Sequence, residues 1–281
     1  MISSKPSKKT GPVLSDEKYV HGYTGREAVR LHDQAGTLTA LLHHDTRYPP
    51  GSAVLEAGCG VGAQTIILSR NSPGASITSI DISPDSIAQA DGLLRRAGVV
   101  NVTLAVGDVF DLSYGDASFD HVFACFLLEH LDRPGAALEH LKRVLREGGS
   151  ITVIEGDHGS AFFHPDSEKA KLAIMCLIDS QSALGGDALI GRRLYPLLEE
   201  AGFRDVSVSP RMVYVDSSRP ELVEGFTRNT FTAMVEGARD KAIELGLASP
   251  EDLDEGIRDL YRTAEHDGVF CYTFFKGTAR K

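Results

Sequence analysis

The chain has 281 residues, of which 42% are hydrophobic and 24% charged, and this composition is typical of a folded globular protein. Its formal net charge of -10 argues against a nucleic-acid or anionic-membrane partner, because both need a basic surface. The four cysteines are widely spaced and form no C-x-x-C pair, so we expect neither a metal site nor disulfides. No apolar run approaches the roughly 18 residues of a membrane span, and we expect a cytoplasmic protein.

The N-terminal region predicts a flexible lead-in followed by one helix. Residues 1–22 are polar, and the first 15 lack the apolar core of a secretory signal. Thr24 and Glu27 have the spacing of a capping box, and apolar residues at helical spacing follow over residues 25–43. An apolar helix ahead of the main domain can pack over a ligand cleft or against a second copy, so a homo-oligomer through this helix is one expectation.

From residue 50 onward, strand and helix patterns alternate. Strands are predicted at 54–57, 76–82, 102–106, 119–126 and 150–155, and helices at 65–70, 84–97 and 134–145. Parallel strands need crossover helices, so this order predicts an α/β, Rossmann-like, doubly wound and mostly parallel sheet. Further strands at 206–215 and 270–277 bring the predicted sheet to seven strands.

The regular alternation ends after Glu155. Residues 157–167 contain two His, two Phe and a Pro and are predicted as a loop, and helices are predicted at 168–184, 190–201, 220–247 and 250–265. We therefore expect one domain over 23–281. Its core would comprise 50–155 and 190–281, with helical lid insertions at about 156–190 and 216–268.

A glycine turn at residues 56–62 follows the first predicted strand of the core. Gly58, Gly60 and Gly62 let the backbone approach a ligand where a Cβ would clash, and the turn lies at the carboxyl end of a strand, where open α/β sheets bind ligands. Gly58, Gly60 and Ala63 also satisfy the dinucleotide fingerprint G-x-G-x-x-G/A. The glycines alone therefore leave a nicotinamide cofactor open.

Acidic residues at three strand ends favour a different nucleoside cofactor. Glu56 inside the turn would repel a pyrophosphate but attract the ammonium of an amino-acid group. Asp81 ends the second strand, where a carboxylate can accept both hydroxyls of a ribose. Asp108 ends the third strand, where it can accept a hydrogen bond from an adenine amino group while Val109 packs against the ring.

These motifs resemble those of class I S-adenosylmethionine-dependent methyltransferases over about residues 50–155. The resemblance rests on the E-x-G-x-G-x-G motif at 56–62, the acids at 81 and 108, the strand start at 119–122 and a turn at 145–149 in which Glu147 replaces the usual proline. It implies that S-adenosylmethionine is the cofactor and S-adenosylhomocysteine the product. Five motifs in the family's order identify the cofactor class and say little about the acceptor.

The resemblance also implies a role for each matching residue. It places the methionine end of the cofactor at Glu56, Gly58, Cys59, Gly60 and Gly62, the ribose at Asp81 and Ile82, and the adenine at Asp108 and Val109. The loop after the fourth strand would face the sulfonium through Cys125, Phe126 and His130. From the N-terminal helix, the residues that would close over the cofactor are Tyr23, Arg30 and Gln34.

The acceptor side is predicted with fewer signals. His158 and Glu155 are the proposed general bases, with His164, Asp157 and His130 as further candidates. Aromatic residues are the candidates for lining an apolar substrate site, namely Phe162, Phe163, Tyr195, Tyr214 and Phe226.

We therefore predict methyl transfer to a small, partly apolar metabolite of secondary metabolism, with a terpenoid or prenyl carbon as the suggested acceptor. The alternatives are methylation at oxygen or nitrogen, a nicotinamide-dependent oxidoreductase, and a binding module without catalysis.

Overall fold

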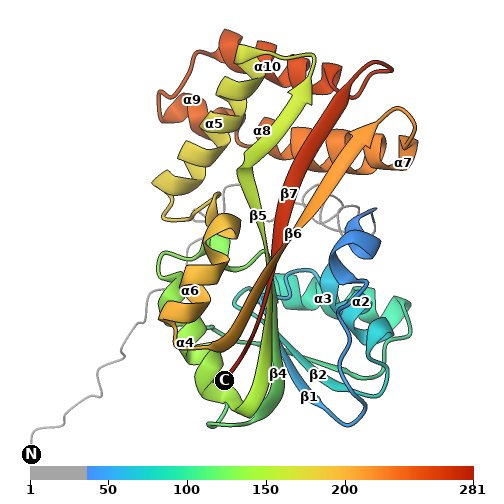
Figure 1. Cartoon of the computed structure of the whole chain (residues 1–281), viewed down its shortest axis with the longest axis vertical. Helices are drawn as coiled ribbons and strands as arrows, with labels where there is room; N and C mark the ends of the chain where they lie inside the picture. The colour runs from blue at the N-terminus through green and yellow to red at the C-terminus, as the bar shows by residue number, and fades with distance from the viewer. Residues whose placement is uncertain (1–36) are drawn as a thin grey trace, which may run out of the picture.

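A computed structural model describes residues 37–281 as a seven-stranded sheet with helices on both faces (Figure 1). The strand order is β3-β2-β1-β4-β5-β7-β6. The strands are β1 Ala53–Ala57, β2 Ser76–Asp81, β3 Val102–Val106, β4 Phe119–Cys125, β5 Leu145–His164, β6 Arg204–Asp216 and β7 Val269–Arg280. Strands β1 to β5 pair in parallel, and β7 runs antiparallel to both β5 and β6. The predicted doubly wound, mostly parallel sheet is confirmed.

Helices connect the parallel strands and also gather beyond their carboxyl ends. Residues 37–43 are helical. The later helices are α2 Ala63–Asn71, α3 Pro84–Arg96, α4 Pro134–Val144, α5 Glu168–Ala183, α6 Leu194–Glu200, α7 Pro220–Leu222, α8 Ala233–Gly237, α9 Arg239–Glu244 and α10 Pro250–Arg262, with 3-10 turns η2 Leu128–His130 and η3 Ile190–Arg193 and a π-helix η4 Val223–Thr232. Within residues 37–281, none of these helices combines the length and apolar character needed to cross a membrane.

Two apolar cores sandwich the sheet. On one face, Leu138 and Leu141 of α4 and Leu198 of α6 are fully buried in one cluster with the strands. On the other face, Leu38 and Leu42 of the helical segment 37–43 join a second cluster. The sheet is therefore covered on both sides, as its near-continuous apolar parallel strands require.

Three strands extend past the parallel part of the sheet and form an antiparallel arm, which we define as residues 156–164, 211–216 and 269–274. The predicted loop at 157–167 is wrong, since β5 continues to His164 and Phe162–His164 pairs with Val269–Cys271. A register shift lies between Asp157 and Phe162. This strand depends on pairing with a segment more than a hundred residues away, and a local pattern carries no record of such pairing.

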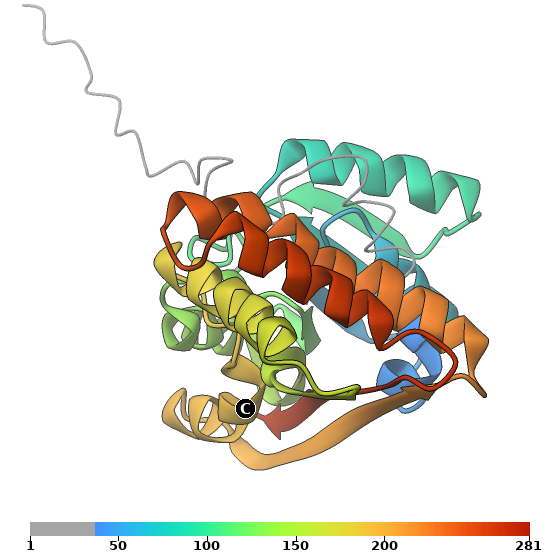
Figure 2. The same ribbon diagram turned by 90° about the horizontal axis from the view of Figure 1, so that it is seen from above.

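Helices α5, η4, α8, α9 and α10 pack on one face of the arm, and we call this layer the helical cap (Figures 1 and 2). The single helix predicted over 220–247 is wrong in detail, because the segment is divided into α7, η4, α8 and α9. Glycine and β-branched threonine recur through this segment, at Gly225, Thr227, Thr230 and Thr232, and these residues form helices poorly. In η4 the hydroxyl of Thr230 donates to the carbonyl of Gly225 at 2.7 Å.

The packing of α10 on α5 predicts a stability change at Gly256. A Cβ at Gly256 would lie 2.2 Å from the carbonyl oxygen of Lys169, so we expect Gly256→Ala to lower the free energy of unfolding by roughly 1–3 kcal/mol. Gly92 is the matched control, because its Cβ would meet only the mobile end of Arg96, at 3.3 Å. Gly92→Ala should raise stability by about 0.5–1 kcal/mol. Urea unfolding of both variants measures the difference, and equal stabilisation by both would contradict the close helix contact.

Candidate active site

The glycine turn is held open by hydrogen bonds to β2. Gly58, Gly60 and Gly62 have φ values of +73°, +51° and +85°, which favour glycine. The amides of Gly58 and Cys59 both donate to the carbonyl of Ile80 at 2.9 Å. A Cβ at Gly60 would meet no atom of the described part of the chain within 4 Å, so these residues leave the backbone open to a ligand at that point of the turn. This geometry fits a nucleoside cofactor lying against the turn.

Asp81 connects the glycine turn to the start of α3. Its Oδ2 accepts from the amide of Gly60 at 2.8 Å, and its Oδ1 accepts from the amide of Ser83 at 2.9 Å. Burial raises the pKa of Asp81, and the two amide hydrogen bonds oppose that rise. The carboxylate therefore shapes the turn in addition to its proposed contact with the ribose.

Glu56 is buried beneath the turn. Its Oε2 accepts from the hydroxyls of Thr65 at 2.7 Å and Ser79 at 2.6 Å, and neither of these bonds uses Oε1. Burial raises the pKa of Glu56 to about 7, against the opposing effect of the two hydroxyls. A nearby cation would favour the ionised carboxylate, so the residue can respond to the ammonium group that we expect there.

The positions predicted to hold adenine and ribose lie at neighbouring strand ends. Asp108 follows β3, and its Oδ1 accepts from the amide of Phe110 at 2.8 Å in a local turn. Val109 is buried in a core cluster. Ile82, which follows β2, is partly buried. The contacts of Asp108, Val109 and Ile82 with the cofactor remain predictions.

The segment that follows β4, residues 126–130, includes η2 and carries candidates for the sulfonium side, and we call it the β4 loop. Cys125 is buried at the end of β4 and burial raises its pKa well above the usual range, as it also does for Cys59 in the glycine turn. Both thiols are therefore unsuited to act as nucleophiles. Phe126 has a φ of +56°, and its ring centroid lies 5.6 Å from that of Phe274. His130 places Nε2 at 3.5 Å from Oε1 of Glu129.

His158 and Glu155 both lie on β5, in different surroundings. The Nδ1 of His158 lies 2.7 Å from the hydroxyl of Tyr272, and the histidine is only 5% exposed. Glu155 is fully buried, and its Oε1 accepts from the amides of Leu127 at 3.1 Å and Leu128 at 2.8 Å. His158 thus belongs to a side-chain pair, whereas Glu155 is bonded to the backbone of the loop.

Aromatic rings surround the His158–Tyr272 pair. The ring of Phe231 meets that of His158 at 6.1 Å between centroids and nearly at right angles. This aromatic cluster lies on the cap-facing side of the arm and comprises Phe126, Phe163, Phe226, Phe231, Phe270, Tyr272 and Phe274. It includes two of the five aromatic candidates from the sequence, Phe163 and Phe226.

The other acceptor-side candidates lie elsewhere. Phe162, Tyr195 and Tyr214 are among the most exposed large side chains of the described chain, so they are wrong as lining residues. Asp157 is engaged in a two-pronged ion pair with Arg192, with both nitrogen–oxygen distances at 2.7 Å. His164 is exposed whereas His158 is buried, and the register of β5 against β7 shifts between Asp157 and Phe162, so the two histidines lie in different environments.

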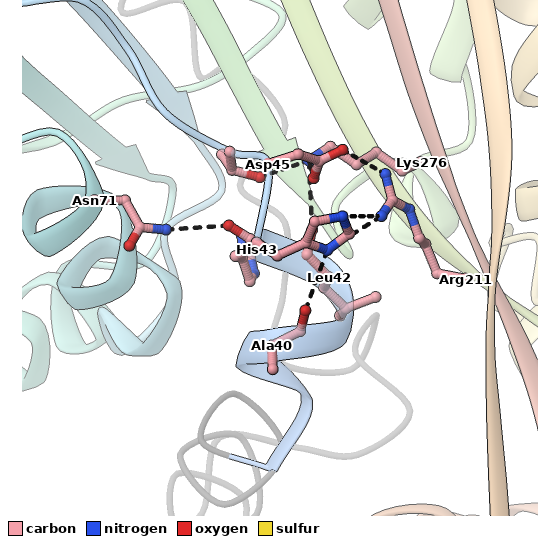
Figure 3. A network of polar contacts seen from close by, with 9 residues as sticks. Ala40, Leu42, His43, Asp45, Asn71, Arg211 and Lys276 are labelled. Carbon is pink, nitrogen blue, oxygen red and sulfur yellow. Dashed lines mark hydrogen bonds and ion pairs between the residues drawn. The ribbon is translucent and has the colours of Figure 1, made fainter.

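Residues 42–46 are anchored to the sheet by a charged network that the sequence did not reveal (Figure 3). Lys276 of β7 is 3% exposed, and its Nζ donates to Asp45, to the hydroxyl of Thr46 at 2.6 Å and to the carbonyl of Leu42 at 3.4 Å. Arg211 of β6 pairs with the other oxygen of Asp45. Burial raises the pKa of Asp45, but the hydrogen bonds from Lys276 and Arg211 outweigh it and bring the pKa to about 2.

On the other side of the same segment, the side chain of Asn71 at the end of α2 donates to the carbonyl of His43 at 3.2 Å (Figure 3). The segment is therefore fixed both to the arm strands and to the helix that follows the glycine turn. The cofactor-closing candidates Tyr23, Arg30 and Gln34, and the proposed oligomer contact of their helix, lie outside the described residues.

Tyr272, Phe270 and Phe274 are functional candidates that sequence reasoning missed. They alternate along β7, and a period of two in aromatic residues was the available signal for one buried strand face. Lys276 continues the same alternation. A lysine in that pattern normally indicates a solvent face, and its acidic partner lies 231 residues away.

Comparison with known proteins agrees with this geometry. Residues 55–153 match the model of a family described as a methyltransferase domain. The chain is 31% identical over 157 residues to the O-methyltransferase resE of Aspergillus sclerotiorum, covering 55% of each protein. It is 27% identical to the 27-O-demethylrifamycin SV methyltransferase of Amycolatopsis mediterranei, covering 82% of this chain and 79% of that one. The chain spans about half the length of several curated relatives that it matches.

Solved structures share the fold at low sequence identity. The cyclase SpnF superposes with a TM-score of 0.53 at 22% identity, covering 89% of this chain and 81% of the other. A phosphoethanolamine N-methyltransferase of Haemonchus contortus, solved with S-adenosyl-L-methionine, gives a TM-score of 0.54 at 18% identity, covering 89% of this chain and 52% of the other. The glycine turn, the strand-end acids, the sheet order and the family match lead to one assignment. Residues 55–153 form a methyltransferase domain of the class I S-adenosylmethionine-dependent type.

Proposed function

We propose that this protein transfers a methyl group from S-adenosylmethionine to a hydroxyl of a small, partly apolar metabolite of secondary metabolism. The helical cap acts as a lid over the acceptor, and the aromatic cluster supplies the apolar surroundings. Among the alternatives from the sequence, a nicotinamide-dependent oxidoreductase receives no support from the family that residues 55–153 match.

The β4 loop is the observation that carries this proposal, because it touches both the cofactor side and the acceptor side. A Cβ at Gly58 would lie 2.8 Å from Cδ1 of Leu127, so this leucine packs directly on the glycine turn. The neighbouring Phe126 belongs to the aromatic cluster around His158 and Tyr272. A cofactor against the turn and an acceptor beside His158 would therefore meet at this loop.

Each group of the chain then has a proposed task. Bound S-adenosylmethionine supplies an activated methyl group for in-line displacement. Glu56, Asp81 and Asp108 hold the cofactor's ammonium, ribose and adenine, and the β4 loop and the cap exclude water and orient the acceptor. As a general base, His158 would carry a proton on Nδ1 and donate a hydrogen bond from it to the Tyr272 oxygen, 2.7 Å away. Its Nε2 would then take the acceptor's proton.

The acceptor atom distinguishes two forms of the proposal. A hydroxyl acceptor loses a proton as it is methylated, and the buried His158 could accept that proton. Both relatives described above are named for methylation at oxygen. The second candidate is a terpenoid or prenyl carbon, because methylation of an alkene creates positive charge and aromatic ring faces stabilise cations. A nitrogen acceptor would also lose a proton and is included in the acceptor tests.

The first test measures the melting temperature and binding heat with S-adenosylhomocysteine and, separately, with NAD(H). Stabilisation by S-adenosylhomocysteine alone is expected, and stabilisation by NAD(H) alone would overturn the proposal. Turnover is then followed as S-adenosylhomocysteine formation across matched alcohols, amines and alkenes of similar size. Tight cofactor binding with no methylated product from any class would instead support a binding module.

Glu56 predicts a pH dependence of cofactor affinity. Its pKa in the free protein is about 7, and a cofactor ammonium beside it would lower that pKa, so binding releases a proton. Affinity for S-adenosylhomocysteine should therefore be full above pH 7 and fall below it, by at most about tenfold per pH unit. Calorimetry in buffers with different ionisation enthalpies measures the released proton.

Glu56→Gln is the control, because its amide oxygen can still accept from Thr65 and Ser79 without titrating. The variant should flatten the pH dependence of affinity. The stability of the free protein depends on pH in the opposite direction to the affinity. A carboxyl whose pKa is raised from 4.5 to about 7 stabilises the free fold fully below pH 4.5, and this contribution is lost as the pH rises through 7. An unchanged slope in Glu56→Gln would assign the pH dependence to another group.

A further inference from the structure

The conformation of the β4 loop requires support from its surroundings. Phe126 adopts a φ of +56°, which is uncommon for a bulky side chain and persists only where neighbouring groups hold it. Its amide donates to the carbonyl of Ile154 on β5 at 2.9 Å. The 3-10 turn η2 then begins at Leu128, and the first amides of such a turn lack partners within the turn.

Glu155, the residue after Ile154, supplies those partners. One oxygen, Oε1, accepts from the amides of both Leu127 and Leu128, at 3.1 and 2.8 Å. The side chain is fully buried, so water does not compete for these two bonds. Removal of the carboxyl would leave two buried amides unsatisfied at the start of the loop.

The loop that Glu155 holds is also fixed at its far end. The carbonyl of Glu129 accepts from the amide of Asp187 at 2.8 Å and from the side-chain nitrogen of Gln181 at 3.0 Å, both in the region that follows and ends α5. At the near end, Leu127 packs on Gly58 of the glycine turn. The β4 loop is therefore a rigid connection between the cofactor turn and the helical cap.

The surroundings of the second carboxyl oxygen of Glu155 disfavour a negative charge on this residue. Oε2 is buried and has no hydrogen-bond partner among residues 37–281. A negative charge there would be desolvated and uncompensated, and Glu129 adds a repelling charge nearby. Burial first, and then the charge of Glu129, raise the pKa of Glu155 well above its usual range. A neutral carboxyl keeps an oxygen that accepts from both amides but is a poor acceptor for a substrate proton.

We propose that Glu155 is a positioning residue whose carboxyl fixes the β4 loop, so that Leu127 closes on the glycine turn while His158 performs the proton transfer. This inference rests on the proposed function, and it narrows the sequence-based expectation that Glu155 is a general base.

Three variants in the full-length chain test this role. Glu155→Gln retains the accepting oxygen without an ionisable proton, Glu155→Ala removes both bonds, and Leu127→Ala removes the packing on Gly58 but leaves Glu155 intact. Each is measured by hydrogen exchange of the 126–130 peptide, by S-adenosylhomocysteine affinity and by kcat over a pH range.

Glu155→Gln should keep amide protection, cofactor affinity, kcat and the pH profile within about threefold of the parent protein, because the hydrogen-bond pattern persists. Glu155→Ala should lose protection at Leu127 and Leu128, and its kcat should fall on the order of 100-fold through misplacement of the loop. Leu127→Ala should weaken S-adenosylhomocysteine binding while leaving Glu155 hydrogen-bonded.

Two results would overturn the inference. One is a Glu155→Gln variant with intact protection and cofactor affinity but a kcat at least about 100-fold lower, as expected for a lost general base. The other is normal amide protection in Glu155→Ala. Because hydrogen exchange needs neither cofactor nor acceptor, the loop's role is measured even if S-adenosylhomocysteine fails to bind the parent protein, which would contradict the proposed function alone.

Discussion

Asp81→Ala is expected to weaken S-adenosylhomocysteine binding by roughly 1.5–3 kcal/mol, about 10- to 150-fold in Kd. Two losses contribute to this effect. The ribose hydroxyls lose the charged acceptor that we propose for them, and the amides of Gly60 and Ser83 lose the oxygens that they donate to at 2.8 and 2.9 Å. Isothermal titration calorimetry measures the change directly.

Asp85→Ala is the matched control, because this acid is exposed in the first turn of α3. It removes the same charge four residues away and should leave Kd within about twofold, since interactions of exposed charges are weak. Asp81→Asn keeps one accepting oxygen and should fall between the two. A Kd that is unchanged in Asp81→Ala would remove Asp81 from the cofactor site.

The cofactor half of the site could be predicted from sequence because its determinants are local. The glycines, Glu56 and Asp81 each stand at the end of a short parallel strand, and parallel strands present their carboxyl ends at one edge of the sheet. The pairing of β1 with β2 brings Glu56 beside Ser79, so that two residues 23 positions apart share a hydrogen bond of 2.6 Å. The order of the elements was sufficient to place these residues together.

The acceptor half could be predicted only in part, because its geometry depends on pairings between distant segments. His158 was chosen for its chemistry, but its partner Tyr272 lies 114 residues later on an antiparallel strand. Residue type alone could not show that Glu155 and His158 have different roles, because both can act as general bases. The separation comes from the amides of Leu127 and Leu128, which donate to the carboxyl of Glu155. The β5 part of the arm was predicted as a loop because its pairing with β7 leaves no local signal.

A loss of turnover in His158→Ala is the second large effect that we expect. Loss of a general base typically costs on the order of 10²- to 10⁴-fold in kcat, while S-adenosylhomocysteine affinity should stay unchanged because the proposed cofactor contacts lie on other strands. Tyr272→Phe removes the hydroxyl 2.7 Å from Nδ1 and should lower kcat less, because the histidine remains but is no longer oriented. Initial rates with saturating cofactor and a hydroxyl acceptor measure both.

His164→Ala is the control on the same strand, since this histidine is exposed, and it should leave kcat unchanged. The same variants distinguish the two acceptor types. With a hydroxyl acceptor, the acceptor must lose its proton during methyl transfer, so His158→Ala should slow the transfer step itself. With a carbon acceptor, methyl transfer needs no prior deprotonation, so loss of His158 would affect later proton removal and could leave the first step intact. Normal turnover of a hydroxyl acceptor by His158→Ala would make His158 a structural partner of Tyr272 and would leave the aromatic cluster, with a carbon acceptor, as the better-supported chemistry.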